Sequence, residues 1–394
     1  MKDNFNHYNQ ILSTIKSEGL YKEERTIITP QSIKIKTEDE KNVLNFCANN
    51  YLGLANHPSV IDSFKKGLEV SGVGSGASHL IYGHSAEHSA LEEELAEFTQ
   101  RPRALLFSTG YMANLGVINA LCGRGDNIFE DRLNHASLID AGTTSLSKFS
   151  RYSHSNTLDL TDRMKKVSGI KIVVTDGVFS MDGDIAKIPQ LAEVCQRRQG
   201  WLMVDDAHGF GVMGKNGGGL AEHFNLTIKE IPILVGTLGK AFGTFGAFVA
   251  GSEALVETLV QFSRTYIYTT ALPPAIASAT RTSLKISQHE SWRREKLNHL
   301  IAHFRSVAES LDIKLMESAT PIQPVLLYDD NLVIKVAECL KKNGFLVGAI
   351  RPPTVPKNTS RLRVTISAKH EEEDIEAFLQ SLQSILKNLR VTAK

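Results

Sequence analysis

Short apolar segments alternate with helical patterns from about residue 46 to about residue 285. This order is typical of an α/β fold, in which helices cover a mostly parallel sheet. Beyond residue 286 the order changes and predicts a smaller α+β domain: a long helix, a strand over 322–327, a helix near 331–342, strands over 345–350 and 361–366, and a last helix. We therefore expect a large domain over 46–285 and a small domain over 286–394, preceded by an arm over 1–45.

A lysine follows one of the apolar segments of the large domain. Proline and glycine signals bracket residues 231–236, so Lys240 should stand at the exposed end of a short buried strand. A lysine in this position can form a Schiff base with a carbonyl cofactor such as pyridoxal phosphate (PLP), whose pyridinium nitrogen pairs with a charged group. Most lysines after a strand are plain surface residues, but the motif upstream of Lys240 favours the cofactor.

That motif is an apolar segment, residues 201–205, which ends in two acids, an alanine and a histidine. Strand ends of α/β sheets host sites. An acid beneath a cofactor nitrogen keeps that nitrogen protonated and makes the ring an electron sink. Asp205 is our candidate for this acid, and His208 for a contact with the cofactor's phenolic oxygen or the substrate's carboxylate. For Asp206 we favour a solvated or turn-capping role.

Composition excludes several classes of protein. The chain is 42% hydrophobic and 22% charged with a net charge of +1, which predicts a globular protein without nucleic-acid or membrane partners. Its four cysteines are scattered without Cys-x-x-Cys spacing, so we expect reduced thiols, a cytoplasmic location and no metal site. The polar N-terminus lacks a signal-type apolar stretch, and no apolar run approaches about 18 residues.

Two glycine-rich segments look like phosphate-binding motifs but are not expected to bind phosphate. Residues 72–77 fit the dinucleotide pattern but follow an amphipathic helix rather than a strand, so nicotinamide binding is not expected. Residues 217–219 are best interpreted as a flexible turn.

Six blocks in order resemble the α-oxoamine synthase family of PLP-dependent enzymes over nearly the whole chain. Two are the segments around Asp205 and Lys240, and the others are residues 49–54 (NNYLGL), 108–114 (STGYMAN), 131–137 (DRLNHAS) and 176–184 (DGVFSMDGD). The resemblance implies fold type I of the PLP enzymes, with the N-terminal arm packed on the small domain.

The resemblance also implies the cofactor site. Independently of it, residues 105–110 run from a strand into a helix start, where the N–H groups of Gly110 and Tyr111 can hold a phosphate. Thr269 and Thr270 match a segment that reaches the phosphate of the neighbouring subunit, so a homodimer with shared active sites is implied. The implied PLP contacts are Gly110, Tyr111, His135 (stacked on the ring), Ser180, Asp205, His208, Thr237, Lys240, Thr269 and Thr270, and the implied catalytic residues are Lys240, His135, Asp205 and His208.

Substrate contacts are implied in the same way. Arg363, in the block 360–365, matches the residue that grips the amino acid carboxylate through a bidentate fork. The implied substrate-binding residues are Arg25, Asn50, His135, Thr354 and Arg363, although the sequence leaves open whether Arg25 or Lys22 is the contact from the arm.

Different blocks of the sequence resemble different branches of the family. Residues 349–356 and 360–365 resemble the biotin-biosynthetic branch, which implies decarboxylative condensation of L-alanine with a pimeloyl thioester, carried by CoA or a carrier protein. Residues 18–25 and 45–50 look more like the branch that joins glycine to acetyl-CoA, which is the alternative. A PLP-binding protein without catalysis is a third hypothesis, less favoured because binding alone needs no electron sink beside a base.

Overall fold

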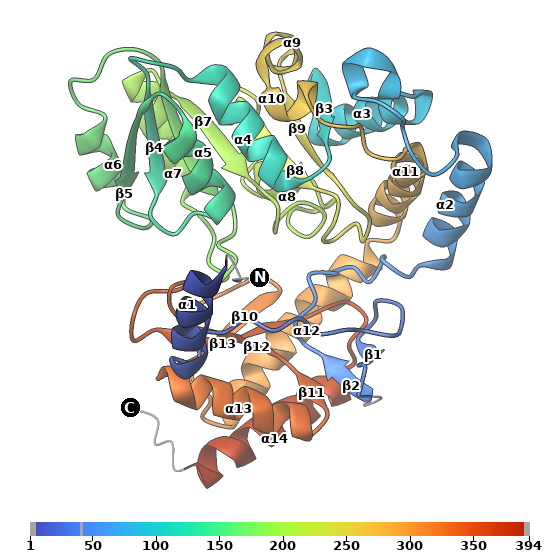
Figure 1. Ribbon diagram of the computed structural model, residues 1–394, viewed down its shortest axis with the longest axis vertical. Coiled ribbons are helices and arrows are strands. Elements are labelled where there is room, and N and C mark those ends of the chain that lie inside the picture. Colours follow the sequence, from blue (N-terminus) through green and yellow to red (C-terminus); the bar gives the residue numbers. More distant parts are fainter. Residues whose placement is uncertain (1–4, 40–41, 390–394) are drawn as a thin grey trace.

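The computed structural model describes residues 5–39 and 42–389, arranged as the two lobes seen in Figure 1. The upper lobe contains a seven-stranded sheet, and the lower lobe contains two three-stranded sheets. Helices cover the large sheet, which confirms the α/β class predicted from the alternation of segments.

The large sheet has the strand order β3-β9-β8-β7-β6-β4-β5. Neighbouring strands pair in parallel except for β9, which is antiparallel to both β3 and β8. The carboxyl ends of β6, β7 and β8 therefore meet at one edge of the sheet, where α/β proteins place their sites. The strands are β3 (Arg103–Phe107), β4 (Asn127–Asp131), β5 (Lys148–Tyr152), β6 (Lys171–Asp176), β7 (Trp201–Asp205), β8 (Ile233–Thr237) and β9 (Ala247–Gly251).

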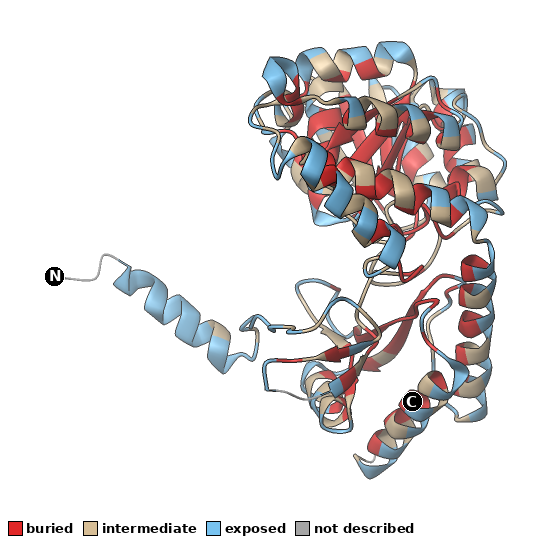
Figure 2. Ribbon diagram, turned by 90° about the vertical axis from the view of Figure 1, so that its right-hand side faces the viewer, coloured by how far each residue is buried: buried red, intermediate tan, exposed pale blue. Residues whose placement is uncertain are grey.

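Both faces of the large sheet are buried. Val173 and Val204 pack into one cluster of buried side chains, whereas Ile172, Val174 and Met203 pack into another. Because successive residues of a strand point to opposite faces, a strand covered on both sides reads as a continuous apolar run. Figure 2 shows this sheet as the buried centre of the lobe, with exposed residues on the helices and loops around it.

The helices of the upper lobe vary in length, and a short π-helical turn precedes α3. They are α2 (Pro58–Ser71), η1 (His79–Gly83), α3 (Ala86–Thr99), α4 (Gly110–Leu121), α5 (Ala136–Thr144), α6 (Thr157–Arg163), α7 (Ile188–Arg198), α8 (Gly219–His223), α9 (Glu253–Phe262), α10 (Arg264–Ile267) and α11 (Pro274–His289).

The lower lobe pairs one antiparallel sheet with a second, mixed sheet. The first has the order β10-β13-β12, and the second has the order β1-β2-β11, in which β11 lies parallel to β2. The elements are β1 (Lys34–Lys36), β2 (Asn42–Asn45), α12 (Trp292–Ser310), β10 (Ile322–Tyr328), α13 (Asp330–Lys342), β11 (Phe345–Leu346), β12 (Gly348–Ile350), β13 (Ser360–Thr365) and α14 (Glu372–Asn388).

Two details of the lower lobe differ from the sequence prediction. The expected strand over 345–350 is two strands, because the chain passes from one sheet to the other at the buried residue Val347. The long helix expected from about 286 is α12, which begins at Trp292 after α11 has ended at His289. The domain limits at residues 45 and 285 remain predictions, and residue 285 lies inside α11.

The N-terminal segment contributes both to the lower lobe and to the outer surface. Strands β1 and β2 join the sheet of β11. Helix α1 (Asn6–Ser17) buries none of its side chains and projects from the rest of the chain in Figure 2. Within the described residues, none of the helices has both the length and the apolar character needed to cross a membrane.

Candidate active site

Acidic and basic side chains meet where β6, β7 and β8 end. Asp176 ends β6 and lies in register with Asp205, which ends β7. Lys240 belongs to the turn after β8, as the sequence predicts. Gly243 closes that turn at φ 65°, and a Cβ on it would lie 2.2 Å from the backbone nitrogen of Ala55. Only glycine therefore lets the lysine turn approach the segment 49–55 so closely.

Asp205 is buried and held by donors on both carboxylate oxygens. Asn114 of α4 donates from Nδ2 to Oδ2 at 2.7 Å, and the backbone N–H of Ala207 donates to Oδ1 at 3.1 Å. The same Asn114 amide donates to Ser137 Oγ at 2.8 Å. A carboxylate has about four acceptor positions, so Asp205 retains the capacity to accept from a protonated ring nitrogen.

Lys240 lies among charges of both signs. Burial lowers its pKa to about 8, while the negative charges of Asp205 and Asp176 oppose that shift. Its Nζ lies 2.8 Å from Nε2 of His208. A larger fraction of this lysine is therefore the neutral amine near pH 7 than of an ordinary lysine.

Two histidines flank the lysine. Burial first, and then the positive charges of Lys240, Arg363 and His135, lower the pKa of His208 well below its usual value, so it is neutral. His135 caps the N-terminus of α5, and its backbone N–H donates to Asp176 Oδ2 at 2.8 Å. Partial removal from water lowers the pKa of His135, against the opposing charge of Asp205. The His135 side chain remains exposed, so its ring is accessible to a ligand.

Arg363 reaches this group from the lower lobe. It lies on β13, buried, with Nε donating to the carbonyl oxygen of Ser180 and Nη2 donating to Oδ1 of Asn49 at 3.1 Å. The site therefore includes residues of both lobes.

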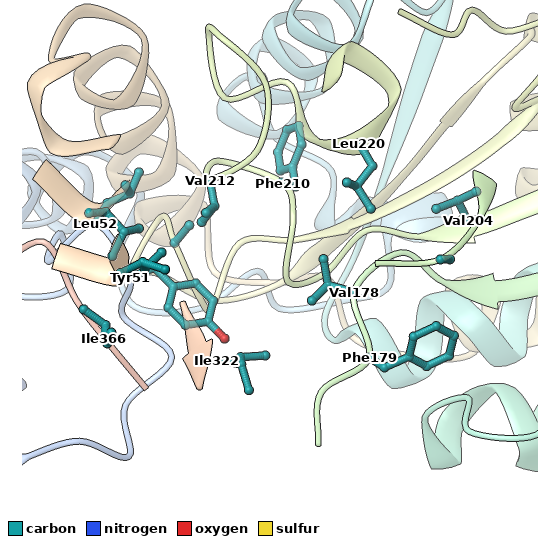
Figure 3. Close-up of a cluster of buried hydrophobic side chains, with 14 of the residues drawn as sticks. Tyr51, Leu52, Val178, Phe179, Val204, Phe210, Val212, Leu220, Ile322 and Ile366 are labelled. Carbon is teal, nitrogen blue, oxygen red and sulfur yellow. The ribbon is translucent and has the colours of Figure 1, made fainter. Parts of the chain in front are cut away.

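The loop that follows β6, residues 177–185, carries Ser180 and is fixed at its far end by a histidine. His154 lies between two carboxylates, with Nδ1 2.9 Å from Asp131 Oδ1 and Nε2 3.0 Å from Asp184 Oδ2. Although burial opposes it, hydrogen bonding to the two acids raises the pKa of His154 to about 10. The Phe179 ring, which Figure 3 draws in the buried cluster, stands edge-on to this imidazole at 4.5 Å between centroids.

The phosphate candidates occupy two places. Gly110 and Tyr111 begin α4, whose cap residue Thr109 accepts from the N–H of Met112. A Cβ built on Gly110 meets nothing within 4 Å, so this helix start opens onto free space. Thr237 ends β8, half-buried. Thr269 and Thr270 lie beyond α10, where Ser78 forms a β-bridge with Thr270, and Thr270 is exposed.

The substrate candidates other than Arg363 and His135 are more scattered. Asn50 uses its side-chain oxygen to accept from Leu54 N at 2.9 Å and Ala55 N at 3.2 Å, whereas its neighbour Asn49 contacts Arg363. Thr354 is exposed in the loop between β12 and β13.

Both basic candidates of the N-terminal arm are exposed. The charge of Arg25 acts on Cys47, as does that of Arg363, although burial dominates and raises the pKa of this thiol to about 11.

Sequence reasoning missed four residues of the cluster: Asn49, Tyr51, Asn114 and Asp176. All four lie inside the motif blocks, but neither residue type nor position in a block shows which side chain faces the site. Asp206, expected to be solvated or turn-capping, is fully buried and accepts from Leu220 N at 2.6 Å. Its expected solvation is therefore wrong, and the bond that it accepts comes from the first turn of α8, 14 residues along the chain.

A cluster of three histidines, His79, His84 and His88, could gather around a metal. His79 Nδ1 and His84 Nδ1 lie 2.8 Å apart, and His88 Nε2 is 2.7 Å from the carbonyl oxygen of Leu272. These ring nitrogens already have partners, so the cluster does not present three free lone pairs. A second group lies between α12 and α14. The absence of a metal site remains a prediction.

The donor and acceptor set fits PLP. Lys240 would hold the aldehyde carbon, Asp205 would pair with the ring nitrogen, and the open first turn of α4 would hold the phosphate through N–H groups without intrahelical partners. The observation that supports this fit is the free space at Gly110, at the same edge of the sheet as Lys240 and the buried carboxylate of Asp205.

Comparisons with known proteins agree with this geometry. A family model described as aminotransferase class I and II matches residues 41–382. A curated 8-amino-7-oxononanoate synthase of Saccharophagus degradans is 54% identical over 380 residues, which cover 96% of each chain. One from Ectopseudomonas mendocina is 56% identical over 371 residues, covering 94% of this chain and 95% of the relative.

Solved structures show the same likeness. A serine palmitoyltransferase from S. paucimobilis with a bound PLP–myriocin aldimine superposes with a TM-score of 0.92, at 29% identity and 98% coverage of both chains. An 8-amino-7-oxononanoate synthase from Francisella tularensis superposes with a TM-score of 0.78, at 34% identity, covering 89% of this chain and 99% of that one.

Proposed function

The chain belongs to the aminotransferase class I and II family and, within it, to the 8-amino-7-oxononanoate synthases, and from this membership we propose that it joins L-alanine to a pimeloyl thioester. It is a PLP-dependent acyltransferase of fold type I, and its reaction releases CO2 and a free thiol in the synthesis of biotin. The observation that carries this assignment is the 54–56% identity to these synthases over nearly the whole chain. The alternative, glycine with acetyl-CoA, finds no support in these relatives.

Bound PLP supplies an electron sink for the electron pair left on the Cα of the amino acid. Lys240 is the base that removes the Cα proton, and its pKa of about 8 leaves a useful fraction of neutral amine near pH 7. The carboxylate of Asp205, held by Asn114 and Ala207, would pair with the ring nitrogen. An opposite charge there would favour the protonated nitrogen, and thus the electron sink.

Arg363 orients the amino acid. Its guanidinium presents a fork of donors that matches a carboxylate in a bidentate way. Its bonds to Ser180 and Asn49 fix the position of the guanidinium. The carboxylate held there is the group that leaves as CO2.

The two histidines have separate tasks. His135, whose side chain is exposed, would cover one face of the cofactor ring and help to position the substrate. His208, neutral and within 2.8 Å of Lys240, would contact the phenolic oxygen of the cofactor and orient the substrate. Ser180 and Thr237 would complete the polar contacts of the cofactor.

The acyl donor is a pimeloyl thioester of CoA or of a carrier protein. We assign its contacts to Thr354 in the exposed loop before β13 and to the arm. Of the two arm residues we favour Arg25, whose charge, like that of Arg363, lowers the pKa of Cys47 against the larger effect of burial. Asn50 holds a turn in this structure, and Asn49 is the residue of that pair beside Arg363.

The active sites are shared in a homodimer. Support comes from the surface beside Thr269 and Thr270, where Leu80, Ile81 and Tyr82 of η1 are exposed. In a dimer these threonines would reach the phosphate of the partner subunit. A cytoplasmic location remains a prediction from the scattered thiols.

Thiol release tests the function directly. The PLP-loaded protein is assayed with L-alanine or glycine, each crossed with pimeloyl-CoA or acetyl-CoA. We expect release of CoA only with L-alanine and pimeloyl-CoA. A preference for glycine with acetyl-CoA would contradict the proposal, and inactivity with all four pairs would point to a carrier-protein donor if pimeloyl carrier protein restores turnover, or against the proposal if it does not.

A further inference from the structure

Four hydrogen-bond contacts in series join Lys240 to Arg363. Lys240 Nζ lies 2.8 Å from His208 Nε2, and His208 Nδ1 lies 2.7 Å from the Tyr51 hydroxyl. The hydroxyl lies 3.2 Å from Asn49 Oδ1, which lies 3.1 Å from Arg363 Nη2. Tyr51 is completely buried, and Figure 3 draws its ring in the apolar cluster, so water does not replace these partners.

Both ends of this series are donors. A guanidinium has no acceptor, so the Asn49 oxygen must accept from Arg363. An ammonium also has no acceptor, and Lys240 is mostly an ammonium below its pKa of about 8. Nε2 of His208 must then accept from Lys240, because an N–H at that nitrogen would oppose a second donor at 2.8 Å.

The two donors at the ends of the series determine which groups donate and which accept between them. His208 is neutral and has one N–H, which must be at Nδ1 once Nε2 accepts. Tyr51 keeps its proton because burial raises its pKa to about 12. Its oxygen accepts from Nδ1–H, and its O–H donates to Asn49 Oδ1. Every donor in the series then has an acceptor, and the opposite direction would leave two donors facing each other.

We propose that Tyr51 is a positioning residue that holds His208 in the tautomer protonated at Nδ1 and bare at Nε2. The inference rests on the proposed role of Lys240 as the lysine that takes the cofactor. A bare Nε2 accepts an N–H from either form of Lys240, so the neutral amine keeps its lone pair for the aldehyde carbon. The other tautomer would repel the ammonium and would occupy the lone pair of the amine.

Tyr51→Phe should therefore lower the pKa of Lys240. Without the hydroxyl, the buried Nδ1–H of His208 has no acceptor, which favours the tautomer with its proton on Nε2 and thus the neutral lysine. The substitution leaves unaltered the other charged and titratable groups that act on Lys240 (Asp205, Asp176, Arg363 and His135). An unsatisfied buried donor shifts such an equilibrium by about tenfold, or about one pKa unit.

The experiment measures cofactor capture rather than turnover. The full chain is freed of PLP, and the rate constant of its covalent reaction with PLP is followed from pH 6 to pH 10. We expect the midpoint of this profile to fall by about one unit in Tyr51→Phe. Tyr152→Phe is the matched control, because Tyr152 is equally buried and its hydroxyl lies outside the series. An unchanged or raised midpoint in Tyr51→Phe would overturn the inference.

A second measurement does not depend on how the variant folds. In wild-type protein labelled with ¹⁵N-histidine, NMR identifies the tautomer of His208, whose signals are assigned by their loss in His208→Gln. We expect the proton on Nδ1 at pH 7, and a proton on Nε2 would refute the proposal. If borohydride reduction places PLP on a lysine other than Lys240, the proposed function fails instead, so the two failures are distinguishable.

Discussion

Removing the His154 side chain should destabilise the protein in a pH-dependent way. His154 bridges Asp131 of the sheet and Asp184 of the loop 177–185, which carries Ser180 toward Arg363. His154→Ala leaves two carboxylates without the cation between them. The loop should therefore be held less firmly, and the free energy of unfolding should fall.

The magnitude follows from the pKa of His154. Its rise from 6.5 to about 10 corresponds to a ceiling of about 5 kcal/mol at about 1.36 kcal/mol per unit. The side chain is 30% exposed, so solvent screening reduces this ceiling, and we expect a loss of about 3 kcal/mol. Because the pKa is raised in the folded state, this stabilisation is complete below pH 6.5 and disappears as the pH rises through about 10.

Urea unfolding at pH 6, 8 and 10 tests this reasoning. The free energy of unfolding of His154→Ala should fall below that of the wild type by about 3 kcal/mol at pH 6 and by much less at pH 10. His299→Ala is the control, because it breaks a contact with Glu372 in which both side chains are largely exposed, and should destabilise the protein far less than His154→Ala. Equal losses at pH 6 and pH 10, or a loss below about 1 kcal/mol at pH 6, would refute the argument.

Three further predictions concern the site. Lys240→Ala should lose covalent PLP attachment, checked by mass spectrometry after borohydride reduction, and should lower turnover by at least about 10²- to 10⁴-fold. Arg363→Lys should raise the KM for L-alanine about tenfold or more, because a point charge replaces a bidentate fork, and steady-state kinetics will show it. Gly243→Ala should lower the thermal midpoint, because its φ of 65° costs an alanine about 1–2 kcal/mol and its Cβ would overlap the backbone of Ala55.

The fold could be predicted from the sequence where local pattern decides it. Continuous apolar runs identified the buried strands of the large sheet, because a strand covered on both faces has no polar side. The strands of the lower lobe were harder to predict. The run over 345–350 looks like one strand, but its two halves pair with partners about 300 and 15 residues away in the sequence, which local pattern cannot show.

The candidate site likewise contains some residues that could be predicted from the sequence and others that could not. Lys240 and Asp205 are visible in the sequence because Asp205 ends one buried strand and Lys240 follows another, and parallel strands bring their ends together. Asn49 and Asn50 are adjacent and chemically identical, and only the backbone shows that one contacts Arg363 while the other caps a turn. The role of Tyr51 depends on its contact with His208, 157 positions away, and could not be predicted from its own motif.

The most direct test of the central claim follows the Cα proton of L-alanine. The PLP-loaded protein is incubated with L-alanine in D2O without an acyl donor, and NMR measures loss of the Cα–H signal. We predict exchange in the wild type and none in Lys240→Ala, since this lysine is the base that removes the proton. Exchange at an equal rate in the variant, or its absence in the wild type, would contradict the account.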